Sequence, residues 1–299
     1  MTYDEMLEQI RNGDGFIAAL DQSGGSTPKA LRGYGVEDDA WSGDEEMFAM
    51  IHTMRSRIVT SPCFNGGKVL GAILFEKTMD GDADGKPVPT VLQERGVVPF
   101  LKVDKGLEDE DKGVQLMKPM PGLTELLKRA KDKGVFGTKM RSVINSADPQ
   151  GIAAIVKQQF DVGNQIVDAG LMPILEPEYT ITAEDRAEGE EILRDEILKA
   201  LDELSGGRQV MLKLSIPAVP GTYDALVDHP AVARVVALSG GYSRGDACAE
   251  LAKNKGMIAS FSRALLEELR HQMDDKQFDD ALSTAIDEIY CASAEKNAA

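Results

Sequence analysis

The stretch "PQGIAAIVKQQFDVGNQIVDAGLMPILEPE", residues 149–178, contains one complete helix–strand unit. Its first part has apolar residues at helical spacing and ends in Gly170, the residue type that most often closes a helix. Its second part, 171–178, is a short apolar run that turns acidic at its end. Such runs are typical of parallel strands that are covered on both faces. The stretch therefore predicts an α/β protein.

Seven further segments have the same strand character and alternate with helical segments. They are 15–23, 69–76, 97–106, 135–144, 209–217, 232–241 and 256–263. Eight strand–helix units without an internal linker predict a single (β/α)8 barrel, or TIM barrel, over residues 1–299. The alternative is an open doubly wound sheet, but "DQSGGSTPKALRG" after the first strand matches neither common glycine-rich nucleotide motif.

Two expectations concern the ends of helices. The segment "TAEDRAEGEEILRDEILKALDEL" opens with Thr182 and, three residues later, Asp185, which is a variant of the capping box. We expect a helix to begin there. At the end of the chain, we expect residues from about 290 to 299 to form a frayed tail.

Composition excludes several classes of protein. The chain has 50 acidic and 33 basic residues and a net charge of −17, which disfavours binding to nucleic acid or to an anionic membrane. No apolar run approaches the roughly 18 residues that a membrane span needs, and the N-terminus is too acidic for a secretory signal. The cysteines Cys63, Cys248 and Cys291 lie far apart. We expect a soluble, cytoplasmic protein without disulfides.

The sequence predicts no metal and no other cofactor. His52, His229 and His271 lie outside the predicted strand ends. The segment "DGDADG", 80–85, imitates the start of a calcium loop, but Val91 stands where the loop needs glutamate and two prolines interrupt it. We expect a turn there.

Polar residues gather where the predicted strands end, often two positions apart. Because side chains alternate along a strand, this spacing puts both members of a pair on the same side. In a barrel that side can be the interior near the mouth, where barrel enzymes carry their chemistry. Five such pairs would be costly to bury unless they bind each other or a ligand. The pairs are Asp21 and Ser23, Lys102 and Asp104, Lys139 and Arg141, Glu176 and Glu178, and Lys213 and Ser215.

The cluster is slightly cationic although the chain is acidic, which suits an anionic ligand. Its charged members are Lys102, Lys139, Arg141, Lys213 and Arg263 against Asp21, Asp104, Glu176 and Glu178. The last two strands end in "LSGG" and "SFSR", small residues whose backbone N–H groups can bind a phosphate, as barrels often do after strands seven and eight.

Lys213 lies in the middle of the apolar strand "QVMLKLSIP", 209–217. Taken alone, the strand could lie at a sheet edge with the lysine facing water. Burial beside other cations would instead favour the neutral amine, which can attack a ketone or aldehyde to form a Schiff base. A neighbouring carbon–carbon bond can then break, with a carboxylate such as Glu176, Glu178 or Asp21 transferring protons. We expect Lys213 to be a buried nucleophile.

Eight stretches between residue 15 and about residue 265 resemble the short bacterial form of class I, or Schiff-base, fructose-1,6-bisphosphate aldolase. In order they are "GFIAALDQSGGSTPKAL", "ILFEKTM", "LKVDKG", "TKMRSVI", "PILEPE", "MLKLSIP", "LSGG" and "SFSRAL". The resemblance implies a metal-independent lyase of glycolysis and gluconeogenesis that cleaves fructose 1,6-bisphosphate reversibly. The products would be dihydroxyacetone phosphate and glyceraldehyde 3-phosphate.

The resemblance also implies roles for individual residues. Lys213 would form the imine, Glu176 would assist as acid and base, and Asp21 would take the C4 hydroxyl proton. Lys139 would help to keep the nucleophile neutral, and Glu178 would hold the cations in place. The implied substrate- and phosphate-binding residues are Ser23, Ser26 and Lys102 towards the C6-phosphate, Ser239, Gly240, Ser262 and Arg263 at the C1-phosphate, and Arg141 and Gly241.

The chain departs from the animal members of this family in several places. Gln22 replaces the glutamate of an Asp-Glu-Ser motif, Ala30 replaces a basic residue, and Phe261 and Ser262 replace a Tyr-Gly pair. The terminal tyrosine of the animal enzymes is absent, with Tyr290 the nearest candidate. These differences concern substrate preference and pH behaviour more than the reaction.

Three alternatives stay open. The same chemistry could act on tagatose 1,6-bisphosphate, which differs from the fructose isomer at C4. The protein could be another Schiff-base barrel such as a transaldolase, although residues for two phosphates speak against it. From another class, it could be a non-catalytic binding protein that acts through its acidic helices. The chain could form a homo-oligomer, which the sequence does not determine.

Overall fold

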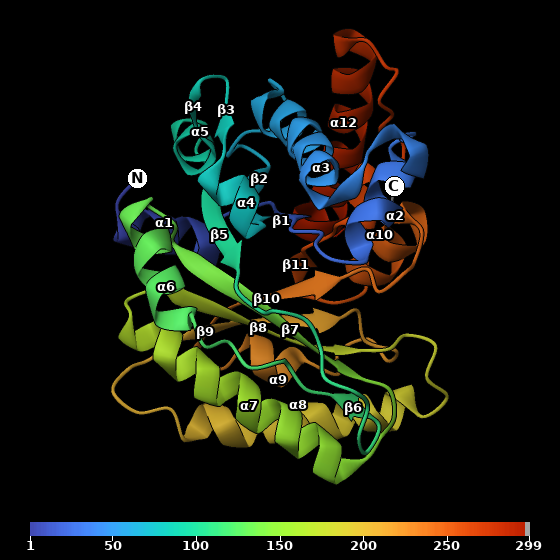
Figure 1. Cartoon of the computed structure of the whole chain (residues 1–299). Helices are drawn as coiled ribbons and strands as arrows, with labels where there is room; N and C mark the ends of the chain where they lie inside the picture. The colour runs from blue at the N-terminus through green and yellow to red at the C-terminus, as the bar shows by residue number, and fades with distance from the viewer. Residues whose placement is uncertain (297–299) are drawn as a thin grey trace.

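The computed structural model describes residues 1–296 and shows eight parallel strands that form a nearly closed barrel surrounded by helices (Figure 1). Seven of these strands fall within a predicted segment and β8 extends one residue beyond its own, so the (β/α)8 prediction is confirmed. In spatial order the strands are β1 (Phe16–Leu20), β2 (Val69–Leu74), β5 (Val98–Lys102), β7 (Gly137–Ile144), β8 (Met172–Tyr179), β9 (Val210–Ser215), β10 (Val232–Leu238) and β11 (Ile258–Ala259).

A backbone hydrogen bond joins the first strand of the barrel to the segment after the last strand. The backbone N–H of Ala19 in β1 donates to the carbonyl of Phe261, just after β11, at 3.0 Å. Three short strands add to the main sheet or stand apart: β6 (Val114–Gln115) pairs with the end of β7, and β3 (Asp82–Ala83) forms a hairpin with β4 (Lys86–Pro87).

The helices cover the outside of the barrel and one of its ends (Figure 1). They are α1 (Tyr3–Asn12), α2 (Ser26–Gly33), α3 (Gly43–Thr60), α4 (Glu76–Asp80), α5 (Val88–Glu94), α6 (Leu123–Asp132), α7 (Pro149–Asp168), α8 (Arg186–Asp202), α9 (Asp224–Val227), α10 (Arg244–Ala252), α11 (Arg263–Leu266) and α12 (Asp275–Tyr290). Two further turns are the 3-10 helix η1 (Asp38–Ala40) and the π-helix η2 (Cys291–Glu295).

The barrel interior is apolar at the end where the strands begin. Side chains such as Ile17, Phe100 and Met211 pack there, and Met6 and Ile10 of α1 close this end. The alternate residues of the strands pack outwards against the helices in the larger apolar cluster. Because the interior is filled at its beginning, space for a site is left at the opposite end, where the strands finish.

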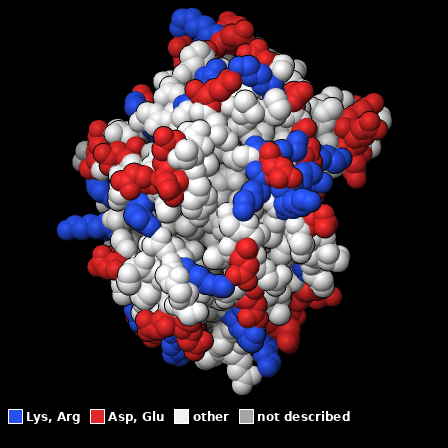
Figure 2. Space-filling view, turned by 90° about the vertical axis from the view of Figure 1, so that its left-hand side faces the viewer, with Lys and Arg blue, Asp and Glu red and all other residues white. Residues whose placement is uncertain are grey.

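On the face shown in Figure 2, acidic side chains do not form a separate patch. Figure 2 views the left-hand side of Figure 1, where α1 and α6 lie, and shows groups of mixed acidic and basic side chains around a largely uncharged centre. None of the helices within residues 1–296 combines the length and the apolar character that a membrane crossing requires.

The predicted turn at 80–85 is confirmed, whereas the predicted helix cap is wrong. Asp84 and Gly85 have φ angles of 50° and 73° and form the turn between β3 and β4. Helix α8 begins at Arg186, and the Asp185 carboxylate makes no capping bond. Instead, it accepts from the backbone N–H of Ala147 at 2.7 Å and from the Tyr179 hydroxyl at 3.2 Å. Because the Asp185 carboxylate binds these two groups from other segments, it does not bind the N–H groups at the start of its own helix.

The predicted frayed tail is wrong for the residues that the structure describes. Cys291–Glu295 continue α12 as the π-helical turn η2, with Ala292 and Ser293 buried. The Ser293 hydroxyl accepts a hydrogen bond from the backbone N–H of Ala259 in β11 at 3.0 Å. This hydrogen bond ties the turn η2 to the short strand β11, so the chain is ordered as far as η2. The predicted tail residues 297–299 lie outside the described residues.

Candidate active site

A cavity of about 1210 Å³ opens at the end of the barrel where the strands finish. All the residues predicted for the site line it: Asp21, Ser23, Ser26, Lys102, Lys139, Arg141, Glu176, Glu178, Lys213, Ser239, Gly240, Gly241, Ser262 and Arg263. The structure therefore brings together residues that are up to 242 positions apart in the sequence.

Strand alternation explains why these side chains point inward. In β1 the interior residues Ile17 and Ala19 are apolar, and Asp21 follows at the same spacing of two. Phe100 precedes Lys102 in β5 in the same way, and Met211 precedes Lys213 in β9. Each interior face thus changes from apolar to charged as it reaches the mouth.

Lys213 lies at the centre of this charged layer. Strand β9 has β8 on one side and β10 on the other, so the alternative of an edge strand with a solvated lysine is wrong. The side chain is 4% exposed, and its Nζ lies 3.1 Å from Oε1 of Glu176. An amine this buried is held by a single carboxylate in the described structure.

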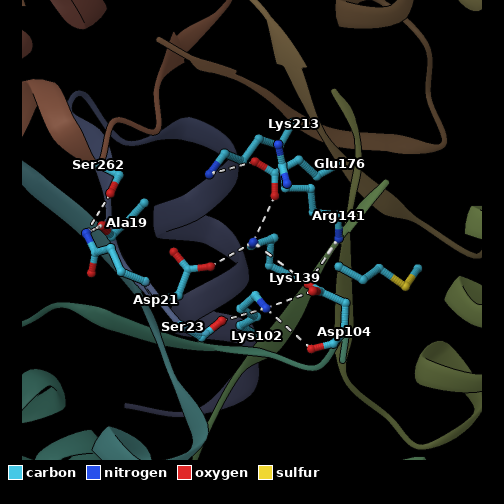
Figure 3. A network of polar contacts seen from close by, with 12 residues as sticks. Ala19, Asp21, Ser23, Lys102, Asp104, Lys139, Arg141, Glu176, Lys213 and Ser262 are labelled. Carbon is cyan, nitrogen blue, oxygen red and sulfur yellow. Dashed lines mark hydrogen bonds and ion pairs between the residues drawn. The ribbon is translucent and has the colours of Figure 1, made fainter. Parts of the chain in front are cut away.

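Glu176 is shared between two lysines. Its other oxygen, Oε2, lies 2.9 Å from Nζ of Lys139 (Figure 3). Burial alone would raise the pKa of Glu176, but the charges of Lys139 and Lys213 outweigh it and hold the pKa below its ordinary value. The carboxylate is therefore ionised and in contact with both amines.

Lys139 is surrounded by carboxylates. Its Nζ lies 2.7 Å from Asp21 and 2.9 Å from Glu176, with Asp104 at 4.0 Å. Burial would lower the pKa of Lys139, but these three charges raise it well above its ordinary value. For Asp21 burial opposes ionisation, and the charge of Lys139, followed by those of Lys213 and Lys102, keeps its pKa well below its ordinary value. Lys139 is thus a fixed cation and Asp21 a fixed anion.

One rim of the cavity is formed by the segment after β1 and the end of β5. Nζ of Lys102 donates to the Ser23 hydroxyl at 3.0 Å and lies 2.7 Å from Oδ1 of Asp104. The Ser26 hydroxyl, in the first turn of α2, donates to the carbonyl of Ser23 at 2.8 Å and accepts from its N–H at 2.9 Å. These groups place a cation and two hydroxyls at one end of the site.

The opposite rim follows β10 and β11. Gly240 and Gly241 have φ angles of 60° and 126°, and a Cβ at Gly240 would come within 2.5 Å of Ile181. Only glycine suits this turn. A Cβ at Gly241 would lie 3.4 Å from the Arg263 guanidinium, so the turn and the arginine face the same space. A second anion could bind there to backbone N–H groups and to a guanidinium.

Comparison with known proteins identifies the family. A model of the family described as "Glycolytic: Fructose-bisphosphate aldolase class-I" matches residues 5–215, which is most of the chain. The chain belongs to the class I fructose-bisphosphate aldolase family. It is therefore an aldolase, which is a type of lyase, and a sugar phosphate is the kind of substrate that this family implies.

Two solved structures share the fold of this aldolase. Fructose-bisphosphate aldolase from Plasmodium falciparum, solved with TRAP and a small-molecule inhibitor, has 21% sequence identity and a TM-score of 0.80, over 98% of this chain and 95% of that one. A protein from Corynebacterium glutamicum has 13% identity and a TM-score of 0.54, over 98% and 93% of the two chains. At these sequence identities the similarity supports the barrel fold and does not assign a function to this chain.

The predicted cation holder of this aldolase, Glu178, contacts a narrower set of cations than expected. Among residues 1–296 its ion pair is with Nε of Arg141, which lies on the neighbouring strand β7 opposite Glu176. Asp104, which was predicted in the mouth cluster without a role, is the more central carboxylate. It contacts Lys102 and Lys139 and accepts a hydrogen bond from the backbone N–H of Arg141 at 3.1 Å.

Arg55 was missed in the sequence. It lies on α3, is 1% exposed, and donates to the carbonyl and side-chain oxygens of Gln22 in the cavity wall. A signal was present, because Arg55 stands in the apolar stripe of its helix, four residues after Ile51 and three before Ile58. An arginine in such a stripe must find polar partners inside the protein.

Proposed function

We propose that the protein cleaves fructose 1,6-bisphosphate reversibly to dihydroxyacetone phosphate and glyceraldehyde 3-phosphate through a Schiff base on Lys213, without a metal. The observation that supports this most is the buried contact of 3.1 Å between Lys213 and Glu176 inside the cavity. A lysine in an apolar strand with a proton acceptor at contact distance is suited to nucleophilic attack on a ketone.

The first stage would be imine formation. Lys213 passes a proton to Glu176 and its neutral amine attacks C2 of the open-chain ketose, which gives a carbinolamine. Glu176 then returns the proton to the C2 hydroxyl, which leaves as water, and the C=N bond forms. Lys139 would support this stage because its amine contacts the same carboxylate at 2.9 Å and holds Glu176 in place beside Lys213.

The second stage would be cleavage. The positively charged imine draws the electrons of the C3–C4 bond, while Asp21 takes the C4 hydroxyl proton and the C4 carbon becomes an aldehyde. Glyceraldehyde 3-phosphate leaves, and the enamine that stays on Lys213 is protonated at C3 and hydrolysed to dihydroxyacetone phosphate. Asp21 suits this role because its contact of 2.7 Å with Lys139 keeps it ionised.

The two rims of the cavity would bind the two phosphates. Ser239, Gly240, Gly241, the backbone of Ser262 and the Arg263 side chain would bind the C1-phosphate, and Ser23, Ser26 and Lys102 would bind the C6-phosphate. Cations and N–H or hydroxyl donors at both ends favour a bisphosphate over the monophosphates of a transaldolase. Arg141, paired with Glu178, would line the space between the two rims.

The proposal is tested by measuring cleavage with the purified protein in a dehydrogenase-coupled assay, with and without EDTA. We expect fructose 1,6-bisphosphate to be cleaved at the same rate in both conditions. Inhibition by EDTA that added zinc reverses would contradict the metal-independent mechanism. Tagatose 1,6-bisphosphate is the matched comparison, because it differs only at the C4 centre beside Asp21; a higher kcat/KM for tagatose would overturn the substrate assignment and leave the chemistry standing.

A further inference from the structure

Arg55 is buried beneath the rim of the cavity and is held by neutral oxygens. Its Nη1 donates to the Thr78 hydroxyl at 2.8 Å, and its Nη2 donates to the carbonyl and the side-chain Oε1 of Gln22. None of the ion pairs within residues 1–296 includes Arg55, although it is 1% exposed. A buried charge without a carboxylate partner costs stability, so an apolar residue would serve better if Arg55 only filled space.

Gln22 is the residue that Arg55 holds, and it joins both sides of the barrel seam. Its Nε2 donates to the Ser262 hydroxyl at 2.6 Å and to the carbonyl of Ala19 at 3.3 Å (Figure 3). Gln22 therefore connects the end of β1 to the segment after β11. Arg55 donates hydrogen bonds to the backbone carbonyl and to the side chain of Gln22, and so it holds both the backbone and the side chain in place.

The neighbours of Gln22 in the chain are both site residues. Asp21 on one side contacts Lys139 at 2.7 Å, and Ser23 on the other contacts Lys102 at 3.0 Å. Any shift of the Gln22 backbone would move the carboxylate and the hydroxyl together. Through its side chain, the same shift would release Ser262 on the opposite rim.

We propose that Arg55 is a positioning residue for aldol cleavage, which holds Gln22 so that Asp21 and Ser262 keep their places on either side of the bound sugar phosphate. This inference rests on the proposed function. The proposal separates the two stages of the reaction, imine formation and C3–C4 cleavage. Lys213 and Glu176 lie on β9 and β8, and the hydrogen bonds of Arg55 within the described structure go to Thr78 and Gln22. Imine formation therefore does not depend on Arg55, whereas C3–C4 cleavage does.

The test compares two activities of one variant. In Arg55→Met we expect kcat for fructose 1,6-bisphosphate cleavage to fall by about 10- to 100-fold, the size of effect that a small misplacement of a catalytic group produces. At a saturating concentration of dihydroxyacetone phosphate, its borohydride trapping on Lys213 should stay within about twofold of the wild type, because Lys213 and Glu176, which form the imine, do not contact Arg55. Weaker phosphate binding at Ser262 would raise only the concentration that saturates trapping. Arg55→Lys keeps the charge and one donor and should recover part of kcat.

Arg95→Met is the matched control. Arg95 also donates to two backbone carbonyls, those of Thr60 and Ser61, but at the far end of α3 and outside the cavity lining. Its loss should lower the melting temperature without changing kcat or KM. A purely structural role for Arg55 predicts the same pattern in Arg55→Met.

Each outcome decides the proposal. A folded Arg55→Met variant with wild-type kcat overturns it, and so does a variant in which trapping falls as far as cleavage. If Arg55→Met does not fold, Gln22→Met removes the same link to Ser262, and it must lose cleavage and keep trapping. Failure of the wild type to trap the ketone would instead refute the Schiff-base function itself, which separates the two hypotheses.

Discussion

The Nζ of Lys213 lies 3.1 Å from Oε1 of Glu176, and each side chain is 4% exposed. The second oxygen of this carboxylate is bound to Lys139, so one anion faces two buried amines. A lysine must leave its ion pairs before its amine can attack a ketone, so the amine with fewer carboxylate contacts is the better placed of the two. Among residues 1–296, Lys139 has three carboxylates within 4.0 Å, whereas Lys213 has one. This asymmetry is our reason for assigning the nucleophile to Lys213.

Lys213→Met should abolish turnover and leave the fold intact. Methionine matches the volume of lysine. Glu176 keeps Lys139 as its partner, so its buried negative charge still has a cation beside it. We expect kcat to fall by a factor on the order of 10³ or more. Initial rates together with a thermal melt measure this. Lys157→Met, which removes an exposed ion pair on α7, is the control and should keep full activity; a Lys213→Met variant with near-normal rates would refute the mechanism.

Lys139→Met should be more damaging to stability than Lys213→Met. It leaves Asp21, Glu176 and Asp104 buried close together without their shared cation, and breaking a buried ion pair on one side costs about 3–5 kcal/mol. The loss should shrink as the pH falls from 7 towards 5, because the abandoned carboxylates can then take up protons. Urea unfolding at both pH values measures the difference. Equal free energies of unfolding for the two lysine variants at pH 7 would contradict a stabilising role for the ion pairs of Lys139.

Acid should weaken the wild type by removing the contribution of Asp21. Its pKa is depressed in the folded protein, so the stabilisation that it provides is complete above its ordinary pKa near 3.8 and is lost as the pH falls below that value. Asp21→Asn lacks this contribution at every pH. The difference in free energy of unfolding between wild type and Asp21→Asn should therefore be constant from pH 5 to 8 and shrink below about pH 4. A difference that grows as the pH falls would contradict the assigned sign.

Arg263→Ala should raise KM for the bisphosphate by about 10-fold or more, the loss expected for a charge-assisted phosphate contact. The side chain is exposed at the start of α11, so the melting temperature should hardly change. Arg270→Ala removes another exposed arginine a short way along the chain and outside the cavity lining, and it should leave KM unaltered. Unchanged KM in Arg263→Ala would mean that the C1-phosphate binds elsewhere.

Most of the fold could be predicted because each strand carries its own signal. A buried parallel strand is a continuous apolar run, and eight of them alternated with helices. The inward direction of Asp21, Lys102 and Lys213 also followed from the sequence, because alternation is a local property of a strand. The helix start at 182 was predicted wrongly because Asp185 has partners from other segments, which no local rule contains.

The polar contacts themselves could not be predicted. Arg55 and Gln22 are 33 residues apart and meet only because the folded barrel brings α3 beside the segment that follows β1. The contact of Gln22 with Ser262 spans 240 residues and depends on the seam between the first and last strands. Glutamine in place of glutamate at this position was visible as a difference from related proteins, but its effect on a buried arginine was not.

The most direct test of the assigned nucleophile is borohydride trapping with dihydroxyacetone phosphate, followed by peptide mass mapping. Reduction converts an imine into a permanent adduct of known mass on the amine that formed it. We predict a single adduct on Lys213 and none in Lys213→Met. No adduct, or an adduct on Lys139, would contradict the mechanism.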